Sequence, residues 1–178
     1  CFELFDNETM RSFLLALIIF LISSTSVFAE ASYVLPYPSA MPGSKFYELH
    51  QLYENLEKYW YFGNFANFHY NLKYSDKYLV ESKTLFEYNQ YLLAIQSLEK
   101  SNSYFVKTKI SIGLAKSNNK NTKEKEKILK NSSIKHKEVL SKIKSITPEE
   151  FNWNPEKGKP TKILIKDKIN GSIQVRSL

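Results

Sequence analysis

The sequence predicts a mainly α-helical domain, an antiparallel helical hairpin or bundle that follows an export signal. Apolar residues recur at spacings of three and four between residues 44 and 147, which is the periodicity of helices with one buried face. Glycine and asparagine interrupt this pattern, and all six prolines lie before or after it. A proline-rich strap is therefore expected before the helices, and a small β-hairpin after them.

The chain begins with the features of a secretion signal. A short basic start at Met10 leads into ten apolar residues, 13–22, and Val27-Phe28-Ala29 places small residues at the −3 and −1 positions of a cleavage site. Ten residues make about 15 Å of helix, roughly half of a bilayer core. We interpret residues 1–29 as an upstream leader plus signal peptide, and expect an exported protein that is secreted, periplasmic or membrane-tethered. An uncleaved anchor over residues 13–28 is the alternative.

Cleavage after Ala29 would leave a cysteine-free chain with a formal net charge of +9, because residues 1–29 hold one arginine and three acids. Disulfides are then excluded. Of the 25 basic residues, only Arg11 and Arg176 are arginine, whereas nucleic-acid sites favour the bidentate arginine fork. We therefore expect no nucleic-acid partner. A solvated lysine-rich surface and attraction to an anionic polymer or lipid both remain open.

Residues 30–43 contain three prolines and cannot be helical, yet Tyr33, Leu35 and Met41 are too apolar for a plain linker. We expect them to lie as a strap along the helical body.

Residues 44–115 are predicted to form an aromatic-rich core of three helices. A short break near Asn89 predicts an antiparallel hairpin of the second and third helices, and small residues such as Ser75 and Ser101 would let them approach closely. The apolar seams are Phe46, Leu49, Tyr53, Leu56 and Trp60, then Phe65, Phe68, Leu72, Leu79 and Phe86, then Tyr91, Ile95, Leu98, Phe105 and Ile112.

The apolar periodicity is weaker in residues 116–178. Residues 116–127 lack apolar side chains and predict a flexible lysine-rich linker, and residues 128–147 predict a fourth helix. In residues 148–178 we expect a loop and a β-hairpin, with strands at 162–166 and 172–176 around an Asn170-Gly171 turn.

Two family resemblances arise from these patterns. Tyr88-Asn-Gln-Tyr-Leu-Leu-Ala-Ile-Gln-Ser-Leu, after a preceding helix, resembles one tetratricopeptide-type hairpin, but a solenoid needs about three such units. Residues 33 to about 105 resemble domain of unknown function 5667, an exported bacterial family, through Tyr33-Val-Leu-Pro-Tyr-Pro-Ser-Ala-Met-Pro-Gly. Lys45-Phe46 stands where that family more often has proline-leucine, and Ser39 where glycine is commoner. The resemblance implies a helical architecture and export, and no activity.

Two candidate binding regions follow from composition. Aromatic rings cluster at the junction of the first two predicted helices and could stack on a glycan or peptide, or else fill the core; they are Trp60, Tyr61, Phe62, Phe65, Phe68 and Tyr70. The lysine-rich linker could act as an electrostatic tether to an anionic surface through Lys116, Lys120, Lys123, Lys125 and Lys127.

We identify no catalytic, cofactor or metal site. His50 and Glu54 share a helical face and could form a metal site with His69, but no second close pair supports it. His136 lies between two lysines, which oppose cation binding. There is no nucleophile elbow, mature cysteine or glycine-rich phosphate loop.

These observations favour an exported, non-catalytic helical domain that acts as a binding or scaffolding module in the cell envelope. Its expected partners are envelope proteins or anionic surface polymers or lipid, with membrane contact only through the N-terminal segment if that is uncleaved. The alternatives are a ligand-sensing domain with an aromatic-lined pocket and, less favoured, an envelope enzyme.

Overall fold

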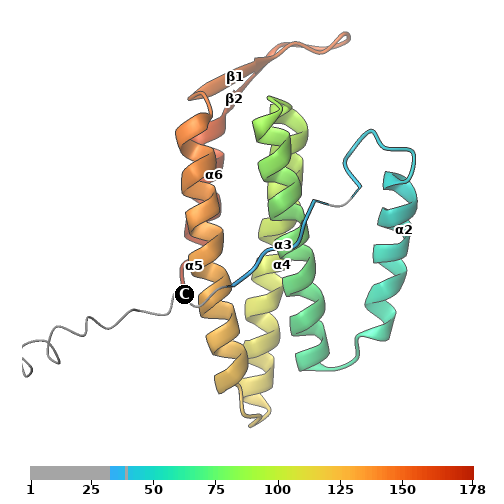
Figure 1. The fold of residues 1–178 in the computed structure, drawn as a ribbon, viewed down its shortest axis with the longest axis vertical. Coiled ribbons are helices and arrows are strands. Elements are labelled where there is room, and N and C mark those ends of the chain that lie inside the picture. The colour runs from blue at the N-terminus through green and yellow to red at the C-terminus, as the bar shows by residue number, and fades with distance from the viewer. Residues whose placement is uncertain (1–32, 39) are drawn as a thin grey trace, which may run out of the picture. The chain divides into compact units, whose positions relative to one another are not determined.

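The computed structural model describes residues 33–38 and 40–178, so the predicted leader and signal peptide lie outside the described part of the chain. The predicted mainly α-helical fold is confirmed, with a small antiparallel two-stranded sheet near the C-terminal end (Figure 1). The elements are α2 (Tyr47–Glu57), the 3-10 helix η1 (Lys58–Trp60), α3 (Asn64–Glu87), α4 (Tyr91–Ser117), α5 (Lys123–Ile146), β1 (Glu150–Trp153), β2 (Thr161–Leu164) and α6 (Ile165–Val175).

Helices α3 and α4 form the predicted antiparallel hairpin at the centre of the fold. Asn89 closes it in the left-handed region at φ 59°, a conformation that asparagine tolerates better than most residues. Buried serines hold the two helices close together, because Ser101 Oγ donates to the Ser75 carbonyl at 2.7 Å and Ser75 Oγ donates back to the Ser101 carbonyl at 3.1 Å. Such short side chains let the two backbones approach and satisfy their own hydroxyls in the contact.

The predicted linker at 116–127 is largely helical, which corrects the sequence interpretation. Helix α4 continues to Ser117 and α5 begins at Lys123, so only residues 118–122 connect them. The first turn of α5 carries Glu124 and Glu126, which favour a helix N-terminus electrostatically. This turn is largely solvated and needs no apolar face, so the hydrophobic pattern did not reveal it.

The C-terminal hairpin forms from different strands than expected. β2 pairs antiparallel with β1, placing Phe151 opposite Ile163, and residues 165–175 form a helix. The predicted second strand at 172–176 is therefore wrong, and Gly171 lies inside α6 instead of in a turn. Ile165 and Ile169, one helical turn apart, are both fully buried in the main core cluster. Their burial against the bundle favours a helix over the β-strand that the alternating pattern of residues 172–176 also permits.

The strap reaches both ends of the core. Tyr33 packs against the cluster around Phe68, and Leu35 and Met41 pack against the larger cluster around Leu79. Figure 1 shows this segment, in blue, crossing α3. Residues 33–178 form one compact unit that contains both clusters.

Candidate functional site

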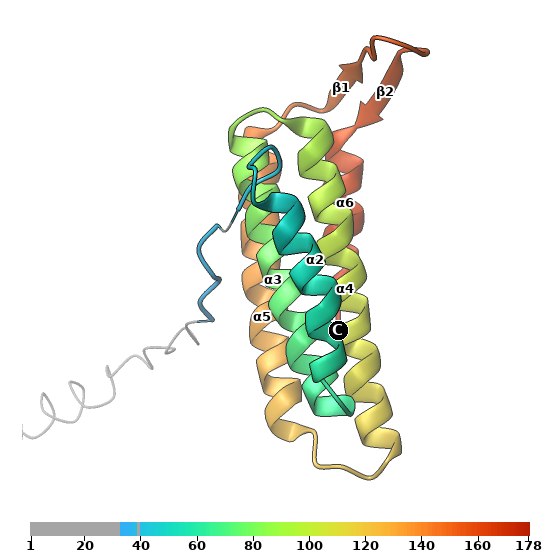
Figure 2. The same ribbon diagram turned by 90° about the vertical axis from the view of Figure 1, so that its right-hand side faces the viewer.

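Helix α2 turns its apolar side away from the rest of the fold. Figure 2 views the domain from the side on which α2 lies in front of α3 and α4. Phe46 is 65% exposed at one end of this side and Trp60 is 66% exposed at the other. We call these exposed side chains the α2 apolar face: Phe46, Leu49, Leu52, Tyr53, Leu56, Tyr59 and Trp60. The sequence interpretation, which placed this seam in the core, is therefore wrong.

The opposite, polar side of α2 docks onto α3 through two buried acids. Tyr78 donates to Glu54 Oε2 at 2.5 Å, and Lys77 forms an ion pair with the same carboxylate. Lys73 Nζ lies 2.6 Å from Glu57 Oε1, and the Tyr74 hydroxyl donates to the other oxygen of that carboxylate. Buried carboxylates are tolerated only when they are paired and hydrogen-bonded in this way.

Tyrosines on α3 supply the surface that receives these acids. Tyr70, Tyr74 and Tyr78 recur at every fourth residue, so they line one face of α3, and their rings pack with Tyr61 and Tyr104 in a buried cluster. The Tyr70 hydroxyl donates to the Glu54 carbonyl at 3.0 Å. A buried tyrosine ring leaves a hydroxyl that requires a partner. The polar side of α2 provides these partners, and the apolar side cannot.

The protonation states of Glu57 and Tyr47 in this contact are fixed at neutral pH. Burial alone would raise the pKa of Glu57, but the ammonium of Lys73 and the hydroxyls of Tyr74 and Tyr61 lower it below its usual range. Burial and the nearby Glu81 carboxylate raise the pKa of Tyr47 to about 12, and the Tyr47 hydroxyl donates to Glu81 Oε1 at 2.9 Å. Glu57 therefore stays ionised, and Tyr47 stays protonated as a donor.

The structure divides the aromatic residues predicted as a binding surface. Trp60 and Phe62 are exposed, Tyr61 and Phe65 are partly buried, and Phe68 and Tyr70 belong to buried clusters. The sequence analysis did not predict that the other residues of the α2 apolar face are exposed. Two features of the sequence indicated this exposed face. Glu54 and Glu57 lie away from the apolar seam of the helix, and the tyrosines that recur every four residues on α3 could donate hydrogen bonds to them.

The five predicted tether lysines surround the connection between α4 and α5. Lys116 pairs with Glu126 at 3.5 Å and Lys125 with Glu124 at 3.2 Å, while Lys123 and Lys127 are exposed. Lys120 Nζ lies 5.6 Å from the centre of the Phe65 ring, at the start of α3. The connections α2–α3 and α4–α5 lie at the same end of the domain (Figures 1 and 2). The lysines are therefore next to the end of α2 that carries Trp60.

A second group of polar side chains is buried between the helices and involves His136, which the sequence analysis set aside. His136 Nε2 lies 2.6 Å from Asp76 Oδ1, and Arg176 Nε donates to His136 Nδ1 at 3.0 Å. Arginine only donates and a carboxylate only accepts, so the ring is neutral with its proton on Nε2. Tyr33 donates to the other oxygen of Asp76 at 2.5 Å. Arg176 also donates to Asn102 Oδ1, Ser172 O and Ser101 Oγ.

This network is structural. His136 and Arg176 are fully buried, and every nitrogen of their side chains and both carboxylate oxygens of Asp76 form hydrogen bonds within the network. Burial lowers the pKa of Arg176 to about 10, with Asp76 opposing the shift, so the guanidinium stays charged at neutral pH. The network joins the strap, α3, α4, α5 and the end of α6, and so fixes the C-terminal helix to the bundle.

The neutral His136 predicts that acid destabilises the domain. Burial lowers the pKa of His136, Asp76 raises it and Arg176 lowers it, and the net direction is down. Below about pH 6.5 the unfolded chain protonates this histidine while the folded state does not, so the unfolded state binds more protons. The contribution of His136 to the free energy of unfolding is fully present above about pH 7. It falls on acidification by at most about 1.4 kcal/mol per pH unit, until the pH reaches the pKa of His136 in the folded state.

Urea unfolding at pH 7.5, 6.5 and 5.5 measures this slope. The double variant His50→Gln/His69→Gln leaves His136 as the sole histidine and is expected to keep most of it. This control is needed because partial desolvation and the nearby Lys125 also lower the pKa of His69. A flat profile in the double variant would contradict the assignment.

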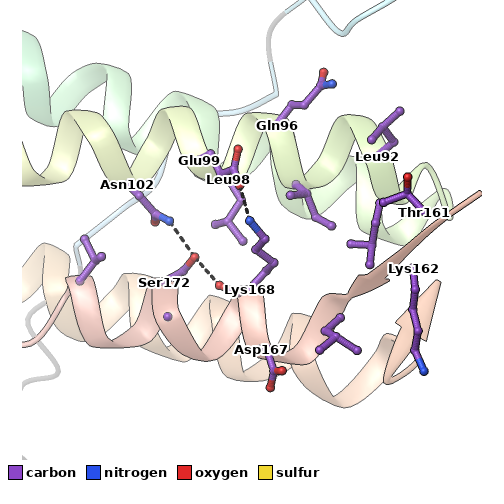
Figure 3. A pocket seen from close by; sticks show the side chains of 15 residues that line it. Leu92, Gln96, Leu98, Glu99, Asn102, Thr161, Lys162, Asp167, Lys168 and Ser172 are labelled. Carbon is purple, nitrogen blue, oxygen red and sulfur yellow. Dashed lines mark hydrogen bonds and ion pairs between the residues drawn. The ribbon is translucent and has the colours of Figure 1, made fainter. Parts of the chain in front are cut away.

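A groove of about 910 Å³ lies between α4 and the β2–α6 segment (Figure 3). Aliphatic and polar residues both line it. Lys168 and Glu99 form an ion pair at 2.8 Å, and Asn102 donates to Ser172 Oγ at 2.8 Å. None of the side chains that line it is aromatic. It is therefore different from the aromatic pocket that the ligand-sensing alternative requires.

In residues 33–38 and 40–178, no three histidine, cysteine, aspartate or glutamate side chains converge as a metal site. Over the same residues, no helix has both the length and the apolar character that a membrane span needs. His50 Nδ1 lies 2.8 Å from the Phe46 carbonyl, within its own helix.

The comparisons with known proteins place the helical body in one family. The sequence profile of the family described as Domain of unknown function (DUF5667) matches residues 39–150, which run from the second half of the strap to the first residue of β1. No curated protein and no solved structure matches the chain. Helix α6 and Arg176 lie beyond the matched segment. The match covers more than half of the chain, and the protein therefore belongs to the DUF5667 family.

Proposed function

We propose that this protein is a non-catalytic binding module whose docking surface is the α2 apolar face. The observation that carries this proposal is the inverted burial of α2, which hides Glu54 and Glu57 and exposes seven large side chains, from Phe46 to Trp60. Contiguous apolar surface of this kind is costly in water and typically marks an interaction site.

The mode of docking supports binding by a preformed surface. Glu54 and Glu57 are each held by a lysine and by tyrosine hydroxyls, so α2 is fixed on α3 by charge-assisted hydrogen bonds. A surface that is rigid before binding loses less conformational entropy when a partner arrives.

The buried carboxylates that face α2 each accept hydrogen bonds within the fold, although Glu81 does so through Oε1 alone, and this favours binding over catalysis. Glu81 accepts from Tyr47 and Ser97, and His136 is enclosed in the bundle. The signal-like segment from Met10 to Ala29 supports an exported protein, so we place the docking event outside the cytoplasm, in the cell envelope.

Site-specific photo-cross-linking in the native cell tests the proposal. A benzophenone amino acid at Leu49 or Leu56 is expected to give covalent adducts, because both positions lie at the centre of the α2 apolar face. The same residue at Ile134, which is 59% exposed on α5, is the matched control and is expected to give none. Absence of adducts at both α2 positions, or equal adducts at Ile134, would refute the docking surface.

A further inference from the structure

We propose that the partner of the α2 apolar face is the surface of an anionic lipid bilayer. This inference rests on the proposed function and adds the chemistry of the partner. It stands on three observations: the width of the apolar face, the kind of side chains on it, and the distribution of charge around it.

The width of the face fits a plane better than a single helix. At about 100° per residue, the exposed side chains of α2 and its N-cap, from Phe46 to Leu56, cover about 120° of the helix circumference. Leu52 extends it beyond the narrow stripe of Phe46, Leu49, Tyr53 and Leu56. A coiled-coil partner would use only that stripe. A broad apolar face on a short helix is suited to lying in a membrane interface.

The side chains on this face are those that favour the headgroup region. Tyr53, Tyr59 and Trp60 combine an apolar ring with a polar atom, and such residues gather where hydrocarbon meets water. Leu49 and Leu56 supply purely apolar anchors between them. Phe62, 82% exposed just beyond η1, continues the aromatic surface toward α3.

The charge around the face is complementary to anionic lipid. Two of the three acids of α2, Glu54 and Glu57, point inward and are paired with lysines, which leaves Glu48 as the exposed acid of this helix. Lys45 and Lys58 are exposed at its two ends. The lysines around the α4–α5 connection lie next to the Trp60 end, and the whole chain carries a formal net charge of +7. Basic residues that flank an apolar face are attracted to anionic headgroups.

The same charges disfavour a second copy as the occupant. Isologous pairing of two α2 faces would bring Lys45 and Lys58 of two strongly basic chains together, and like charges across an interface oppose association.

Vesicle binding by the predicted mature chain, residues 30–178, tests this inference, since residues 33–178 form one compact unit that holds the buried clusters of the described residues. Circular dichroism and cooperative urea unfolding first establish that each variant is folded. We expect binding to vesicles of phosphatidylcholine with 30% phosphatidylglycerol, and at least tenfold weaker binding to phosphatidylcholine alone. Raising the salt from 50 to 500 mM is expected to weaken it strongly.

Matched variants assign the binding to α2. Leu49→Gln/Leu56→Gln is expected to weaken binding at least tenfold, whereas Leu114→Gln/Ile134→Gln, which removes equally exposed apolar residues from α4 and α5, leaves it unchanged. In the Trp153→Phe protein, Trp60 is the single tryptophan, so its emission should shift to the blue and be quenched by brominated lipid.

Three results would overturn the lipid assignment. They are no binding to anionic vesicles, equal binding by the Leu49→Gln/Leu56→Gln variant, and a stable dimer in light scattering that this variant abolishes. Cross-links from Leu49 and Leu56 to protein alone, without vesicle binding, would refute the lipid partner and leave the docking surface intact. Absence of all α2 cross-links would refute both.

Discussion

Replacing Arg176 with methionine is expected to lower the free energy of unfolding by about 3–5 kcal/mol, the range measured when one partner of a buried ionic group is removed. The Arg176 side chain is fully buried and donates to His136, Asn102, Ser101 and the Ser172 carbonyl. Methionine fills similar volume but donates to none of them. The negative charge of Asp76 would then remain buried without a cation in the network.

Urea unfolding followed by circular dichroism at pH 7.5 measures this loss. Lys168→Met is the matched control, because it removes the exposed ion pair with Glu99 and should cost less than about 1 kcal/mol. Adding Asp76→Asn to the Arg176→Met protein removes the unpaired charge and is expected to restore part of the stability. If Arg176→Met costs no more than the control, the network does not hold α6 to the bundle.

Replacing Phe68 with alanine is expected to cost about 3–5 kcal/mol, as for other large side chains removed from a packed core. Phe68 is fully buried and packs with Leu72, Phe105 and Ile112. The measurement is again the free energy of unfolding in urea, compared with the unsubstituted protein.

Trp60→Ala is the informative counterpart to this change. Trp60 lies only eight residues away and carries an even larger ring, but it is 66% exposed, so its replacement should change the stability by no more than about 0.5 kcal/mol. We expect it to weaken docking instead. Equal destabilisation by the two variants would show that Trp60 is a core residue and that the α2 apolar face is not free.

Sequence periodicity predicted the helical segments well where one side of a helix faces a continuous core. α3 and α4 are such helices, and the break at Asn89 was visible in the sequence. It failed at the start of α5, where solvated lysines and glutamates have no apolar pattern. It also failed at residues 172–176, where Ile173 and Val175 alternate as in a strand, while Ile165, Ile169 and Ile173 recur at the helical spacing of four. Only packing of Ile165 and Ile169 against the bundle decides that case.

The candidate site shows a different limit of sequence reasoning. The aromatic junction was correctly chosen as the place to look, since Trp60 and Phe62 are exposed there, but Phe68 and Tyr70 belong to the core. Residue type does not distinguish these roles. An aromatic side chain is stable in either setting, and the choice depends on which neighbours are present to cover it.

The sequence by itself determined the helical class, the hairpin at Asn89, the proline strap and the strongly basic surface, because periodicity, turn residues and charge are local properties. Only the tertiary structure decided which side of α2 faces outward. Tyr70, Tyr74 and Tyr78 on α3 need acceptors for their hydroxyls, and Glu54 and Glu57 need donors once buried. Satisfying these buried polar groups outweighed the burial of leucine, and left the apolar side of α2 exposed.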